Sequence, residues 1–191
     1  SLVLRASDGV NVANATLLVT ITNDNDNRPA FDMDRYDASV PENAEIGTDV
    51  VQVVATDADS GAVLTYSLDE PSTLFVINPS SGIITTLTPL DRETLPGGVQ
   101  FVVVVSDEGE NVDRATVIVS VIDANDNAPM FTDTALAVTV AENAPVGQVV
   151  AAVSATDEDS GINAALVYRL ASVVSGSGLN ATDAFAVDEE T

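Results

Sequence analysis

Residues 115–129 read ATVIVSVIDANDNAP, an alternating apolar run that leads directly into a run of Asp and Asn. From position 115 to 121 the odd positions hold Ala or Val and the even positions hold Thr, Ile or Ser. This period of two predicts a β-strand with one buried face. The same type of sequence stands at residues 15–29, ATLLVTITNDNDNRP, at an offset of 100 residues. Such an offset indicates a repeated unit of one small domain.

Two further motifs hold the same offset. Residues 42–43, Glu-Asn, recur at 142–143, and residues 55–61, ATDADSG, recur as ATDEDSG at 155–161. The repeat therefore predicts three segments along the chain. They are residues 1–27, the last two strands and the linker of one repeat; residues 28–127, a complete repeat; and residues 128–191, the first part of another, with about four strands.

Short β-strands separated by turn residues fill each unit, and no segment keeps a helical period beyond a turn or two. The run FVVVV at 101–105 indicates a central strand that is covered on both sides. These features predict an all-β fold of tandem immunoglobulin-like Greek-key β-sandwich repeats, each of about 100 residues. The strands expected in the complete repeat span residues 34–40, 48–55, 64–68, 74–77, 83–86, 100–106 and 115–121, and those of the first segment span 2–7 and 15–21.

The charge balance of the chain excludes much chemistry. It carries 30 acidic and 6 basic side chains, a formal net charge of −24, and all of its basic residues are Arg. Because Lys, His and Cys are absent, Ser-His-Asp triads, thiolate nucleophiles, ordinary zinc sites and P-loops are excluded. A charge this negative repels nucleic acid. We therefore expect no nucleic-acid partner, no small-molecule substrate and no enzyme activity.

The same charge requires compensation in a folded protein. Hydrophobic residues make up 46% of the chain, enough to bury a core, yet dense carboxylates repel one another in a compact fold. Ca²⁺ takes about six to eight oxygen ligands from carboxylates, amides and backbone carbonyls, which are abundant here. The composition thus favours calcium binding, with a solvated acidic surface as the alternative.

The acidic residues stand at strand ends rather than along strand faces. Glu42 follows the first expected strand of the complete repeat and Asp123 follows the last, so both lie at the same end of the sandwich. Asp57 follows the second, antiparallel strand and lies at the opposite end. Its counterpart in the next repeat, Asp157, therefore faces Asp123 across the boundary. We expect carboxylates to converge on the junctions, where repulsion costs about 1 kcal/mol or more for each close pair.

Four motifs, in this order and spacing, resemble the extracellular repeat of the cadherin superfamily. They are Pro41-Glu42-Asn43, Asp57-Ala58-Asp59, Leu90-Asp91-Arg92-Glu93 and Asp123-Ala124-Asn125-Asp126-Asn127-Ala128-Pro129. The resemblance, which covers essentially the whole chain, implies an extracellular cell-surface module of a single-pass plasma-membrane protein, attached to the membrane by segments outside this chain. It also implies Ca²⁺ as the cofactor and calcium-dependent cell–cell adhesion as the function. The implied partners are other cadherin ectodomains, bound homophilically or heterophilically.

The resemblance further implies three Ca²⁺ ions at the second junction, the boundary between the second and third segments. The side-chain ligands it implies are Glu42, Asp91, Glu93, Asp123, Asn125, Asp126, Asp157 and Asp159. Backbone carbonyls of Ala124, Asn127 and Asn163 would complete the sites. Glu142 would serve a further junction below, although Ala141 replaces the Pro of the motif there.

The first junction, between the first and second segments, departs from this pattern. The ligands implied there are the side chains of Asn25, Asp26, Asp57, Asp59 and Asp107 and the carbonyls of Asp24 and Asn27. Asn23 stands where the pattern has Asp, which removes one negative charge. The loop after Gly61 is two residues shorter than the loop after Gly161, so it lacks a counterpart of Asn163. Asp8 would serve a junction above this one.

Other interpretations share some of these features. A secreted calcium-stabilised β-repeat scaffold or adhesin, without a role between cells, would have the same fold and metal. Asn14 and Asn180 stand in Asn-Ala-Thr sequons, which favour a glycosylated eukaryotic surface protein. The Asp-Ser-Gly tripeptides at Asp59 and Asp159 do not indicate an aspartic protease, because each lies in an acidic loop. The sequence shows no signal peptide and no apolar run of about 20 residues. It starts at Ser1 with an apparent strand, so we expect a piece of a longer chain.

Overall fold

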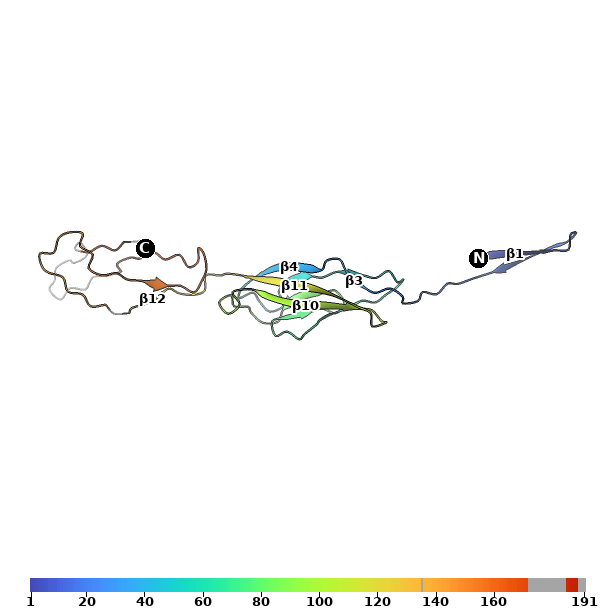
Figure 1. Ribbon diagram of the computed structural model, residues 1–191, viewed down its shortest axis with the longest axis horizontal. Coiled ribbons are helices and arrows are strands. Elements are labelled where there is room, and N and C mark those ends of the chain that lie inside the picture. Colours follow the sequence, from blue (N-terminus) through green and yellow to red (C-terminus); the bar gives the residue numbers. More distant parts are fainter. Residues whose placement is uncertain (135, 172–184, 189–191) are drawn as a thin grey trace.

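The computed structural model describes residues 1–134, 136–171 and 185–188. Figure 1 shows an elongated molecule, with β1 toward one end, the larger sheets in the middle and β12 toward the other end. None of the described residues lies in a helix, which confirms the predicted all-β class. It follows that no helix among them could span a membrane.

Residues 30–122 form the middle unit, a β-sandwich built from a larger and a smaller sheet. The larger sheet has the order β4-β11-β10-β7, in which β4 and β11 run parallel and the other pairs run antiparallel. The smaller sheet has the order β5-β9-β8, and β3 pairs with β6. The bounds are β3 Ala30–Phe31, β4 Arg35–Pro41, β5 Asp49–Gln52, β6 Ala55–Thr56, β7 Thr65–Leu68, β8 Phe75–Ile77, β9 Ile83–Thr86, β10 Val99–Ser106 and β11 Val112–Ile122.

The core lies between the sheets and follows the predicted alternation of side chains. Val117 of β11, Val103 of β10 and Ile84 of β9 are completely buried. Phe75 of β8 is also buried and stacks on Phe101, with the two ring centroids 5.2 Å apart. Burying an apolar side chain of this size stabilises the fold by about 1.5–3 kcal/mol. The core is thus sufficient to hold the two strand ends that lead into the junctions.

Two strand predictions in the middle unit need correction. The strand expected at 48–55 is divided, because β5 pairs with β9 while β6 pairs with β3 in a separate sheet. β10 is an interior strand, as expected, but only its inward side chains, such as Val103 and Val105, are fully buried. The outward Val102 and Val104 are half-buried. A sandwich has two layers, so the outer face of a central strand still meets solvent.

The first segment is an antiparallel hairpin of β1 (Leu2–Ser7) and β2 (Val12–Leu17). The strand predicted at 15–21 is misplaced, because a short turn after Ser7 starts β2 at Val12, directly opposite Ser7. All residues of both strands are exposed, including Asn14 of the first sequon. Asn180 of the second sequon lies outside the described residues.

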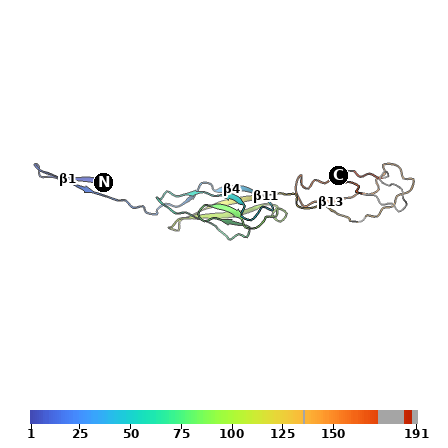
Figure 2. The same cartoon turned by 180° about the vertical axis from the view of Figure 1, so that it is seen from behind.

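The third segment repeats a pairing seen in the middle unit. β12 (Met130–Phe131) pairs with β13 (Ala155–Thr156), and Met130 faces Thr156 as Ala30 faces Thr56. In Figure 2, seen from behind, β13 lies near the linker that follows β11. The described residues of this segment hold these two short strands rather than the three predicted among them, and the fourth predicted strand, equivalent to the one expected at 74–77, lies outside the described residues. Strands without a completed ladder are marginal in water, which accounts for the difference.

Candidate metal centres at the segment junctions

The second junction begins where β4 and β11 end side by side. Pro41 is the register partner of Ile122, so Glu42 and Asp123 leave the sheet as neighbours. The N–H of Glu42 donates to the carbonyl of Ile122 at 2.9 Å. Asn43 then turns the chain with a φ of +58°, a left-handed conformation that Asn tolerates better than most residues. The sheet itself therefore positions the first two acidic residues.

Glu42 connects three separate stretches of chain. Its side chain is buried, and its Oε1 accepts the N–H of Ala124 at 2.5 Å while its Oε2 accepts the N–H of Arg92 at 2.8 Å. The loop that carries Arg92 is held in turn by Leu90, which is buried and accepts the N–H of Asn43 at 2.9 Å. These contacts bring the Leu90–Glu93 loop against the linker after β11.

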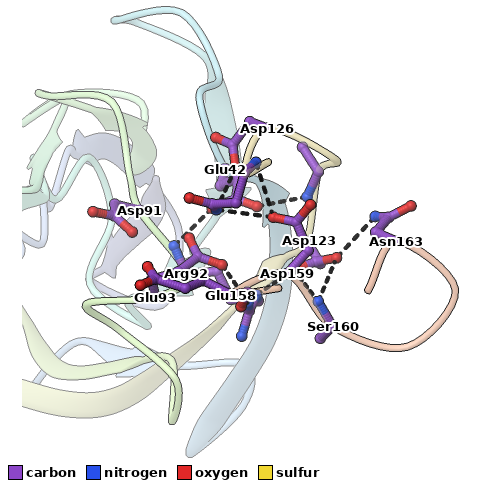
Figure 3. Close-up of polar contacts among 12 residues, drawn as sticks. Glu42, Asp91, Arg92, Glu93, Asp123, Asp126, Glu158, Asp159, Ser160 and Asn163 are labelled. Atoms are coloured by element: carbon purple, nitrogen blue, oxygen red, sulfur yellow. Dashed lines mark hydrogen bonds and ion pairs between the residues drawn. The ribbon is translucent and has the colours of Figure 1, made fainter. Parts of the chain in front are cut away.

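Two overlapping groups of carboxylates result, and Figure 3 shows their arrangement. The first consists of Glu42, Asp91 and Glu93, and the second of Glu93, Asp123 and Asp159. Within each group, one oxygen from every carboxylate lies within 4.8 Å of the others. Glu93 belongs to both groups. Asp159 comes from the third segment, so the second group spans the junction.

Asp123 joins the linker to the third segment. Both of its oxygens accept the N–H of Ser160 at 3.1 Å, and Oδ2 also accepts the side-chain amide of Asn163 at 2.8 Å. Burial would raise the pKa of Asp123, but the bonds from Asn163, Ser160 and Arg92 outweigh it and lower this pKa. At Glu93 burial prevails and raises the pKa. Asp123 is thus held as a carboxylate, while the Glu93 carboxylate is disfavoured by its burial.

Asp159 carries the strongest indication that the site fits a cation. Its Oδ1 accepts two bonds from Asn127, one from the backbone N–H at 3.2 Å and one from the side-chain amide at 2.9 Å. Its Oδ2 is buried and finds no hydrogen-bond partner among the described residues. An unsatisfied buried carboxylate oxygen is costly unless a cation compensates it. An all-oxygen donor set with this charge fits a hard divalent ion such as Ca²⁺.

The remaining predicted ligands of this junction lie around these two groups. Asp126 is exposed and accepts the side-chain amide of Asn127 at 2.9 Å. Asp157 accepts the N–H of Asp159 at 3.0 Å, and the carbonyl of Ala124 accepts the N–H of Asp126 at 2.9 Å. Asn125 is exposed. These four residues lie in the same stretches of chain as the two carboxylate groups, but none of them belongs to either group.

The first junction repeats the second at the same offset of 100 residues. The backbone N–H and the side-chain amide of Asn27 donate to Oδ2 and Oδ1 of Asp59, each at 2.9 Å, whereas both bonds from Asn127 go to Oδ1 of Asp159. Ser60 donates its N–H to Asn23 at 3.3 Å, as Ser160 donates to Asp123. The bonds from Asn27 lower the pKa of Asp59. Oδ2 of Asp57 is buried and lacks a hydrogen-bond partner within the described part of the chain.

Asp107 also lies at the first junction, where it is buried. Asp107 accepts the side-chain amide of Asn111 at 2.8 Å, and this bond lowers the pKa of Asp107. The same amide of Asn111 lies 3.2 Å from the carbonyl of Asn27 and 3.4 Å from Oδ1 of Asn25. Asp24 and Asp26 are exposed. The described residues form no group of three carboxylates at this junction.

Two predicted ligands lie apart from both junctions. Asp8 sits in the turn between β1 and β2, where it accepts the N–H groups of Val10 at 2.8 Å and Asn11 at 2.6 Å. Its side-chain bond with Asn11 is the main reason that its pKa falls to about 2. Glu142 is exposed in a turn of the third segment. Neither joins another carboxylate in a group, so their roles remain predictions for neighbouring junctions.

Sequence reasoning missed several residues that organise the site. Arg92 lies inside the Leu90–Glu93 motif, yet its contacts across the junction were not expected. Asn43 donates its side-chain amide to Asp126, and Asn111 connects Asp107 to the linker. The one available signal for Ser160 was that a Ser follows the Asp-x-Asp motif in both repeats.

The fold and the site define a class of protein, that of tandem β-sandwich repeats joined by acidic linkers. Residues 36–122 match the family model described as the Cadherin domain. The chain is 42% identical over 173 residues to the cadherin EGF LAG seven-pass G-type receptor fmi-1 of Caenorhabditis elegans, a match covering 87% of this chain and 7% of the relative. It is 40% identical over 175 residues to human protocadherin gamma-A12, covering 87% of this chain and 19% of that protein.

A solved structure agrees with these relatives. Mouse cadherin-23 EC22-24 superposes with a TM-score of 0.77 at 34% identity, covering 97% of this chain and 58% of that chain. The chain belongs to the cadherin family, and it spans only a small part of the curated relatives named above. The predicted immunoglobulin-like sandwich is confirmed by these neighbours. Members of this family are adhesion proteins, so the prediction of a non-enzyme is confirmed as well.

Proposed function

We propose that the chain is a calcium-dependent adhesion module whose junctions bind Ca²⁺. The observation that supports this most is the group of Glu93, Asp123 and Asp159, in which one buried oxygen of Asp159 has no hydrogen-bond partner among the described residues. In this proposal the second junction holds three ions, with the ligands predicted above from the resemblance. The first junction binds Ca²⁺ through the ligands predicted above, with one negative charge fewer because Asn23 stands where the pattern has Asp.

Calcium would act by coupling neighbouring units. The second group takes oxygens from the middle unit, the linker and the third segment, so one ion bound there contacts all three. Ions that bind only the aligned arrangement stabilise that arrangement by mass action. The expected result is a stiff rod in place of a chain of loosely connected units.

The organisation of the whole protein follows from the repeat. We propose that residues 28–127 are one complete cadherin repeat, flanked by the end of one repeat and the start of another. The protein would act at the outer surface of the cell, with its membrane attachment outside this chain, and would bind other cadherin ectodomains of the same or a different kind. One relative is named as a seven-pass receptor, so the number of membrane passes is not part of this proposal.

Calorimetric titration with Ca²⁺, with Mg²⁺ as a control, tests the metal. We expect saturable uptake of several Ca²⁺ ions and a rise in melting temperature that Mg²⁺ does not reproduce. Glu93→Gln removes the carboxylate that both groups share and is expected to weaken calcium binding roughly tenfold or more. Glu70→Gln, an equal change at an exposed position, serves as the control. Absence of uptake by the unaltered chain would rule out calcium sites in these three segments.

Aggregation of coated beads tests adhesion separately. Beads carrying the chain, extended by its neighbouring repeats, are expected to cluster in Ca²⁺ and to disperse on chelation. Calcium binding without any clustering, with itself or with other cadherin ectodomains, would instead support a secreted scaffold.

A further inference from the structure

Arg92 is the basic residue of the Leu90–Glu93 motif, and its side chain reaches both sides of the second junction. Its Nε donates to Oδ1 of Asp123 in the linker, and its Nη2 donates to Oε1 of Glu93. The same Nη2 donates to the backbone carbonyl of Glu158, in the third segment, at 2.6 Å. The side chain is 18% exposed. Arg92 thus connects the middle unit, the linker and the third segment, as Figure 3 shows.

Two of the contacts of Arg92 are with carboxylates of the second group. This group brings the three negative charges of Glu93, Asp123 and Asp159 together, and the guanidinium offsets one of them. Ion pairs that are largely shielded from water are screened less by salt than exposed ones. The charge of Arg92 is therefore well placed to reduce the repulsion within the group.

The same contacts compete with a metal ion. Oδ1 of Asp123 faces Arg92 and Ser160, and Oδ2 faces Ser160 and Asn163, so both oxygens are already engaged. Oε1 of Glu93 faces Arg92 as well. An oxygen that turns toward a divalent cation must give up part of its contact with the guanidinium, and the two positive charges then repel each other.

We propose that Arg92 is a tethered cation that competes with Ca²⁺ at the second junction, lowering its calcium affinity while holding the junction aligned when calcium is scarce. The affinity part rests on the proposed function. The alignment part does not, because the bond from Arg92 to the carbonyl of Glu158 involves no metal. Arg92 acts here as a positioning and affinity-setting residue rather than as a metal ligand.

Paired spin labels in the whole chain test both parts. The chain has no Cys, so Ser67→Cys on β7 and Gln148→Cys in the third segment place labels at exposed positions on either side of the junction. Arg92→Gln removes the charge and keeps a polar side chain. Arg35→Gln is the matched control, because Arg35 is exposed and forms its ion pair with Asp37, two residues further along the same strand β4. Circular dichroism and a thermal melt verify that each variant keeps its fold.

Without calcium, Arg92→Gln is expected to broaden the distribution of label distances relative to the unaltered chain and to Arg35→Gln. The calcium concentration that narrows the distribution is expected to be about 5- to 20-fold lower for Arg92→Gln than for the unaltered chain. This factor is the estimated repulsion between a unit charge and a divalent ion about 5 Å apart in salt solution. Arg92→Lys keeps the charge but not the fork of donors. The Arg92→Lys variant is expected to bind calcium as weakly as the unaltered chain, because the positive charge remains. It is also expected to lose the alignment of the junction in the absence of calcium.

The outcomes are distinguishable. An unchanged distribution without calcium would overturn the tether, whatever calcium does. Unchanged or weaker calcium binding by Arg92→Gln would overturn the competition. If the unaltered chain does not respond to calcium, the proposed function fails, while the calcium-free comparison still decides whether Arg92 holds the junction.

Discussion

Asn127 donates two hydrogen bonds to the same oxygen of Asp159, at 3.2 Å from its backbone N–H and 2.9 Å from its side-chain amide. One repeat earlier, Asn27 also donates two bonds to Asp59, but its backbone N–H reaches Oδ2 and its side-chain amide reaches Oδ1. In both cases the linker holds an Asp of the following segment before any metal is considered. Oδ1 of Asp159 is held in this way, while its buried Oδ2 has no hydrogen-bond partner among the described residues.

Replacement of Asn127 tests this linker contact. Asn127→Ala removes one of the two bonds to Asp159, and a hydrogen bond to a charged group contributes about 1.5–3 kcal/mol. We expect calcium affinity at the second junction to fall by roughly tenfold or more and hydrogen exchange at residues 157–163 to accelerate. Asn78→Ala, which removes a side chain that accepts bonds in a turn of the middle unit, should leave both quantities unchanged.

Neutralising Asp159 should change stability with opposite signs in the two conditions. Without calcium, Asp159→Asn relieves repulsion from Glu93 and Asp123, so the junction should melt at an equal or higher temperature. With calcium, the variant lacks a ligand and should gain much less stability than the unaltered chain. Differential scanning calorimetry measures both. A variant that loses stability equally with and without calcium would show that Asp159 serves only the fold.

The core of the middle unit offers a test that is independent of the junctions. Phe75 is buried and stacked on Phe101, so Phe75→Ala should cost about 3–5 kcal/mol in the free energy of unfolding. The neighbouring Val76 is 44% exposed on the outer side of the same strand. Val76→Ala should therefore cost much less, about 0.5 kcal/mol. Urea denaturation at saturating calcium compares the two.

Tyr36 provides a prediction for alkaline pH. Burial, followed by its hydrogen bond to Asp32, raises the pKa of its hydroxyl from 10.0 to about 12. Because the folded state favours the protonated phenol, this contribution to stability is complete below pH 10 and is lost as the pH rises through 12. Absorbance at the tyrosinate band should show one tyrosine of the folded chain ionising late. Tyr36→Phe should abolish that late step, and a late step that persists in the variant would assign it elsewhere.

Much of the fold and the site could be predicted because the sequence repeats. The order of the strands in one repeat placed Glu42 and Asp123 at one end of the sandwich, and the parallel pairing of β4 with β11 brings them together as expected. The alternation around Val117 correctly identified the buried face of β11. The first result follows from the order of the strands, and the second follows from periodicity, which reports which side of a strand is apolar.

The remaining features depend on information that a local pattern does not carry. Apolar residues at Val102 and Val104 do not reveal that no further layer covers them. The division of the strand at 48–55 depends on which strands are its partners, and these lie far away in the sequence. The direction of Arg92 depends on the long-range approach of Asp123 and Glu158, because its flexible side chain could otherwise extend into solvent.

Under the proposed function, calcium aligns the two units at the second junction. Distance distributions between spin labels at Ser67→Cys and Gln148→Cys test it most directly in the otherwise unaltered chain. We predict a narrow distribution in calcium that broadens on chelation and that magnesium does not restore. A distribution of the same width with calcium, with magnesium and with chelator would contradict it.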